Sequence, residues 1–90
     1  MLAQNKQLQV SNLQKMSYQF FEGIANASEP LTYTTRINDE EFQVEVNVVR
    51  ERKFLSVTID FDTAWEGRWK KTSNAKVYQL NPNEVWTEIV

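Results

Sequence analysis

Two neighbouring segments with regular alternation, residues 42–49 and 54–61, constrain the fold of this chain more than any other feature. Successive side chains of a strand point to opposite faces, so each segment forms a strand with one apolar and one polar face. The polar run Arg50–Lys53 between them predicts the turn of a hairpin. The expected register pairs Val48 with Leu55, Val46 with Val57, Val44 with Ile59 and Phe42 with Phe61.

A slip of this pairing by one residue would expose the apolar side chains of a whole strand, so we expect a well-defined register. The same register places Val49 next to Phe54 on the otherwise polar face, beside the turn. Residues such as Glu45 and Thr58 occupy the rest of that face, which therefore suits contact with water.

Further strands are expected on both sides of this hairpin. Leu31–Ile37 alternates in the same way and is followed by a turn over Asn38–Glu41. Residues 31–61 therefore predict a three-stranded antiparallel meander. Residues 67–71 and 76–80 predict a fourth and a fifth strand.

Apolar residues at helical spacing predict a helix near residues 12–27, which would cover the apolar face of the meander. The segment Ser11–Gln14 has the capping-box pattern at its start. Pro30 ends the helix, because the residue before a proline avoids the helical conformation. Residues 1–10 show little pattern and are expected to form a frayed, flexible end, with a short strand at Gln7–Val10 as the alternative.

The segment Asn81–Glu84 combines an N-cap residue, a proline and an acidic residue, which predicts a short C-terminal helix over residues 82–90. The alternative is a strand hairpin that pairs Leu80 with Val85. The expected fold is therefore of the α+β class and forms one domain, residues 1–90. It consists of an N-terminal helix packed on an antiparallel meander of three to five strands, followed by a short C-terminal helix.

The composition excludes several kinds of chemistry. The chain has no cysteine and no histidine, which removes disulfides, thiolate ligands and the commonest general base. Asp60, Asp62 and Glu66 are spaced somewhat like cation ligands, but Ala64 and Trp65 stand where a calcium loop needs an oxygen ligand and a glycine. We therefore expect no metal, no cofactor and no enzyme; an enzyme that uses carboxylates is the third hypothesis for function.

Most of the cations gather in two short stretches, Arg50–Lys53 and Arg68–Lys76. If residues 67–71 run back along the hairpin, Lys70 and Lys71 return towards the turn, and one end of the sheet becomes basic while the other becomes acidic. A basic end beside tryptophans is typical of a nucleic-acid surface. The net charge of −2 is not, because such domains are usually basic overall.

The preferred hypothesis is a non-enzymatic protein-binding or regulatory module that acts through a surface patch, alone or as a homodimer. Tryptophan and arginine often anchor interfaces, and an exposed apolar pair beside a basic turn is typical of a contact patch. A nucleic-acid-binding domain is the alternative. No signal peptide and no long apolar run is visible, so a soluble cytoplasmic protein is expected. The candidate partner-binding residues are Val49, Arg50, Arg52, Lys53, Phe54, Trp65, Trp69, Lys70 and Lys71.

Overall fold

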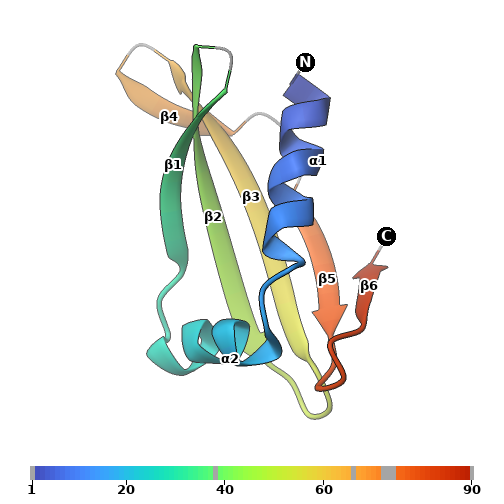
Figure 1. Cartoon of the computed structure of the whole chain (residues 1–90). Coiled ribbons are helices and arrows are strands. Elements are labelled where there is room, and N and C mark those ends of the chain that lie inside the picture. The colour runs from blue at the N-terminus through green and yellow to red at the C-terminus, as the bar shows by residue number, and fades with distance from the viewer. Residues whose placement is uncertain (1, 38, 66, 72–74, 90) are drawn as a thin grey trace.

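The computed structural model describes residues 2–37, 39–65, 67–71 and 75–89. Within these ranges, two helices lie on one face of a six-stranded antiparallel sheet (Figure 1), which confirms the α+β class. The elements are α1 (Leu2–Leu13), α2 (Tyr18–Ala27), β1 (Leu31–Ile37), β2 (Glu40–Arg50), β3 (Leu55–Trp65), β4 (Arg68–Lys71), β5 (Lys76–Leu80) and β6 (Trp86–Ile89). In this part of the chain, no helix is long and apolar enough to cross a bilayer.

The sheet has the order β1-β2-β3-β5-β6, and β4 also pairs with β3. The expected meander corresponds to β1, β2 and β3, and the expected fourth and fifth strands to β4 and β5. Because β2 occupies one edge of β3, both later strands lie along the other edge. The far part of β3, Asp62–Trp65, pairs with β4, and the near part, Leu55–Ile59, pairs with β5.

The apolar faces of β2, β3 and β5 form the core, as their alternation predicts. The side chains of Val44, Val46, Val57 and Ile59 are fully buried. The helices complete the core with three side chains, Val10, Leu13 and Phe21. The other face of the sheet carries mostly polar residues, also as expected.

The expected register of the β2–β3 hairpin is wrong by two residues. Val48 pairs with Val57, and Val46 pairs with Ile59. A shift of two keeps every side chain on its face, so alternation alone does not distinguish the two registers. The turn decides between them: it spans Glu51–Phe54, and the Glu51 N–H donates to the Phe54 carbonyl at 2.9 Å. Val49 consequently lies opposite Ser56 instead of Phe54.

The expected single helix over residues 12–27 is two helices with a break between Leu13 and Tyr18. The cap of the second helix is Ser17, whose hydroxyl accepts a hydrogen bond from the Phe20 N–H. Ser11 lies inside α1, so the capping-box assignment is wrong. The expected alternative, a strand at Gln7–Val10, is wrong too, because α1 runs through these residues.

The expected C-terminal helix is wrong. The chain forms a hairpin there, as in the alternative, but Leu80 pairs with Trp86 instead of Val85. The Asn81 side chain accepts hydrogen bonds from the backbone of Asn83 and Val85, each at 3.0 Å. The Glu84 N–H donates to the Asn81 carbonyl at 2.9 Å, which closes a turn of the type that favours asparagine and then proline. The first turn of a helix has nearly the same backbone, so the sequence signal fits both structures.

Glu84 links this turn to the start of α2. Its φ angle is 64°, in the left-handed region that is unfavourable for residues other than glycine. Its carboxylate Oε2 accepts a hydrogen bond from the Tyr18 N–H at 2.8 Å, although the two residues are 66 positions apart. A carboxylate at a helix N-terminus also interacts favourably with the helix dipole.

Two substitutions at Glu84 separate these effects. Glu84→Ala removes the carboxylate and keeps the left-handed strain, so we expect the free energy of unfolding to fall by about 1 kcal/mol, as for a lost N-cap. Glu84→Gly removes the same carboxylate but relieves the strain, so it should be more stable than the alanine variant by about 1 kcal/mol. Urea denaturation measures both. An alanine variant as stable as the wild type would show that the bond to Tyr18 contributes nothing.

Cysteine pairs test the β2–β3 register, because the chain has no cysteine of its own. Val49→Cys with Ser56→Cys joins directly opposed positions, whose Cα atoms should be about 5.5 Å apart, within the disulfide range. Asn47→Cys with Ser56→Cys is the control, since these residues are opposed only in the register expected from the sequence. Thiol titration and mass spectrometry after air oxidation should show closure of the first pair. Preferential closure of the control would contradict the structure.

Candidate partner-binding groove

Strand β2 extends beyond its neighbour β1, and this overhang creates the most distinctive surface of the molecule. The β1–β2 ladder ends where Leu31 pairs with Val46, whereas β2 continues to Arg50. On the other side, β3 pairs with β2 as far as Arg50. The segment Asn47–Arg50 therefore has a neighbouring strand on only one of its edges.

The hydrogen bond across the turn identifies which backbone groups face the open edge. The Glu51 N–H points towards β3, because it donates to the Phe54 carbonyl. Successive residues of a strand direct their backbone groups to opposite edges. The N–H and carbonyl of Val49 therefore also point towards β3, whereas those of Val48 and Arg50 point to the open edge. Among the residues that the structure describes, no hydrogen bond satisfies the backbone N–H of Val48 or Arg50.

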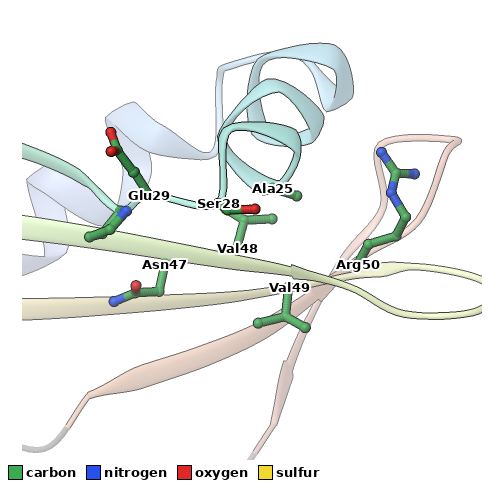
Figure 2. A pocket seen from close by; sticks show the side chains of 8 residues that line it. Ala25, Ser28, Glu29, Asn47, Val48, Val49 and Arg50 are labelled. Atoms are coloured by element: carbon green, nitrogen blue, oxygen red, sulfur yellow. The ribbon is translucent and has the colours of Figure 1, made fainter.

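A groove lies along this open edge, between β2 and the end of α2. Its volume is about 340 Å³, at the lower end of the range of ligand-binding pockets. Figure 2 shows Val48 pointing towards the helix and Val49 pointing to the other face of the sheet. Val49 is 57% exposed. We call this site the β2 groove; its lining residues are Ala25, Ser28, Glu29, Pro30, Asn47, Val48, Val49 and Arg50.

Arg50 ties the groove to α2. Its guanidinium forms an ion pair with Glu22 at 3.2 Å and donates a hydrogen bond to the Asn26 side chain at 2.8 Å. Arginine has five N–H donors, and the Arg50 side chain remains 49% exposed, so the guanidinium can accept a further anionic partner. Its position on the helix side of the sheet follows from the observed register, because Arg50 pairs with the buried Leu55.

The two ends of the groove differ in charge. Arg52 and Lys53 are exposed in the turn beside Arg50, and no carboxylate among the described residues forms an ion pair with either. Glu29, which is also exposed, lies at the opposite end from Arg50, with its carboxylate on the helix side of β2 (Figure 2). Three cations (Arg50, Arg52 and Lys53) and two carboxylates (Glu22 and Glu51) lie near the turn, so that end carries a small positive excess, whereas Glu29 makes the end near β1 negative.

The structure divides the candidate residues of the sequence analysis into two groups. Val49 and Arg50 line the groove. Arg52, Lys53 and Phe54 lie in the adjoining turn, where Phe54 is half-buried.

The second group lies at the other end of β3, where Trp65 pairs with Arg68 and Ala64 with Trp69. Lys70 and Lys71 belong to β4 there, and Lys71 pairs with Asp62. Strand β4 runs back antiparallel to β3, as expected, but it has only four residues, so Lys70 and Lys71 reach Thr63 and Asp62 and do not return to the basic turn. The expected separation of a basic end from an acidic end therefore does not occur.

Most of the groove was not expected from the sequence. The predicted helix ends at residue 27, as α2 does, but the sequence did not show that this end, with Ala25, Ser28 and Glu29, lies beside the last residues of β2. One signal was present: Pro30 precedes a seven-residue strand, while the following strand has eleven residues. A longer strand beside a shorter one must overhang it, and a proline just before the shorter strand is compatible with an edge strand.

The carboxylates and phenols outside the β2 groove give weaker evidence of a functional site. Asp60 and Asp62 lie on the polar face of β3, Glu66 is outside the described residues, and no group of acidic residues within those residues is arranged to hold a metal ion. Burial raises the pKa of Tyr33, and burial together with the Glu88 carboxylate raises the pKa of Tyr78. Neither phenol lines the β2 groove.

Comparison with known proteins gives no further assignment. No protein-family model matches the chain. No curated protein is significantly similar to it in sequence, and no solved structure matches its fold significantly.

Proposed function

We propose that this protein is a non-enzymatic binding module that accepts an extended segment of a partner protein in the β2 groove. The segment would add to the open edge of β2 as a short strand, a recognised mode of peptide binding. The observation that carries this proposal is the unpaired edge at Val48 and Arg50, which lies in a groove instead of on a flat surface.

The physical basis is the cost of leaving backbone groups without partners. Water satisfies the N–H and carbonyl groups of an exposed edge, but a wall of protein on one side restricts its access. A partner strand would replace that water with direct bonds to Val48 and Arg50. Each such bond contributes about 0.5–1.5 kcal/mol net.

The affinity of a short added strand is expected to be modest. Few backbone bonds form, and association itself costs several kcal/mol of rigid-body entropy. A dissociation constant of roughly 10 µM to 1 mM is consistent with these terms, which corresponds to a transient interaction. A regulatory or adaptor role is compatible with such exchange.

The structure gives the nucleic-acid alternative less support than the sequence does. Its argument depends on cations gathered at one end of the sheet, but Lys70 and Lys71 are on β4, at the far end of β3 from Arg52 and Lys53. Phosphate contacts along a single strand would need these cations on one continuous track.

A selection from a displayed library of random short peptides tests the proposal, with purified wild-type protein as the bait. Val48→Pro is the blocking variant: it removes the N–H that faces the groove and leaves the β2–β3 hydrogen bonds in place. We expect the selected peptides to lose at least about tenfold in affinity for this variant, because they lose a backbone bond and meet the proline ring.

Thr34→Pro is the matched control, since alternation directs the Thr34 N–H to the outer edge of β1. The selected peptides should bind this variant like the wild type. Amide chemical shifts of the wild-type protein provide an independent readout, with changes expected at Asn47–Arg50 and Ala25–Glu29. Peptides that bind both variants equally and perturb neither segment would overturn the proposal. Self-association that depends on concentration and disappears in Val48→Pro would instead identify a second copy of the chain as the occupant.

A further inference from the structure

We infer that the partner segment has the order acidic, β-branched, small, with its acidic side chain opposite Arg50. This inference rests on the proposed function and specifies the chemistry of the partner. It follows from three features of the β2 groove: the direction of its backbone groups, the side chains on its two faces and the distribution of its charges.

The direction of the guest strand comes from the sheet. Every pairing within the described residues is antiparallel, and an antiparallel guest places its residues directly opposite those of β2. Read from its N-terminus, the guest then meets Arg50 first, Val49 second and Val48 third. Side chains of opposed residues lie on the same face of a sheet.

The residue opposite Arg50 lies on the helix side of the sheet, beside the guanidinium. Glu22 and Asn26 fix the guanidinium from the α2 side and use only part of its hydrogen-bonding capacity. A carboxylate can accept the remaining N–H donors. Arg52 and Lys53 are exposed nearby and without carboxylate partners among the described residues, so they add positive potential at the same end.

The residue opposite Val49 lies on the other face, where the Val49 side chain is 57% exposed. A β-branched residue there would form a cross-strand apolar pair and would favour the extended conformation. The residue opposite Val48 lies beneath the end of α2, next to Ala25 and Ser28. The nearby helix leaves room for a small side chain such as alanine or serine.

Synthetic peptides test this inference directly. The reference probe is an N-acetylated, C-amidated peptide with Asp-Val-Ala at its centre, and its matched partner replaces Asp with the isosteric Asn. Titration of the isotopically labelled full chain by NMR measures both affinities. We expect the Asp peptide to bind about three to ten times more tightly than the Asn peptide at low salt. This preference should shrink as the salt concentration rises from about 20 mM to about 0.5 M.

Charge reversal locates the source of the preference. In Arg52→Glu with Lys53→Glu, the ratio of the two affinities should fall at least about twofold, because the surrounding potential is reversed while Arg50 stays in place. The control, Lys15→Glu with Arg36→Glu, changes the net charge by the same amount at positions outside the groove lining and should keep the ratio.

The outcomes separate this inference from the proposed function. If library-selected peptides require the open edge but the Asp and Asn probes bind equally, the function stands and the acidic specificity is wrong. The same holds if neither probe binds while selected peptides do. If no peptide depends on the open edge at Val48, both the proposed function and the acidic specificity are wrong. A preference for Asp that survives the reversal at Arg52 and Lys53 but is lost in the control would assign the acidic contact to another surface.

Discussion

The end of α2 determines where β1 begins to pair with β2, and the groove depends on that point. The missing N–H of Pro30 does not interrupt the ladder, because alternation directs that position to the outer edge of β1, as it does at Thr34. Just before Pro30, Ser28 adopts a φ angle of 58° and ends α2, so the chain leaves the helix and enters β1 by a sharp change of direction. Because β1 begins only at Leu31, it cannot pair with the whole length of β2. The last four residues of β2 consequently lie beneath the end of α2 with one edge open.

The helix that forms the wall of the groove is fixed near both of its ends. At its N-terminus, Ser17 and Glu84 satisfy backbone donors, and Trp86 packs edge-on against Phe21 with ring centroids 5.1 Å apart. Towards its C-terminus, Arg50 bonds to two of its side chains. Because these contacts hold the helix in place, the groove is formed before a partner arrives. Binding therefore loses less conformational entropy. The C-terminal hairpin and Arg50 of the groove thus contact the same helix, although they are distant in sequence.

Alternation along the strands predicted much of this fold. The apolar positions of β2 and β3 identified the core face correctly, and the shorter alternating segments identified β1, β4 and β5. The pattern failed where two structures satisfy it equally. A shift of two residues in the β2–β3 hairpin preserves both faces, so only the turn distinguishes the registers. The segment from Asn81 to Glu84 fits a helix start and a hairpin turn alike, and the packing of Trp86 on Phe21 and Tyr78 favours the strand.

Only part of the candidate site could be predicted from the sequence. Val49 and Arg50 adjoin the turn, and the chain composition there indicated a surface with apolar and basic character. The open edge beside them arises from unequal strand lengths and from the path of α2, which are properties of the assembled sheet. Amide hydrogen exchange, measured residue by residue in the free protein, tests this edge most directly. We expect fast exchange at Val48 and Arg50 and slow exchange at Val46 and Val49, because only the latter two amides have strand partners. Protection of Val48 equal to that of Val46 would contradict this expectation.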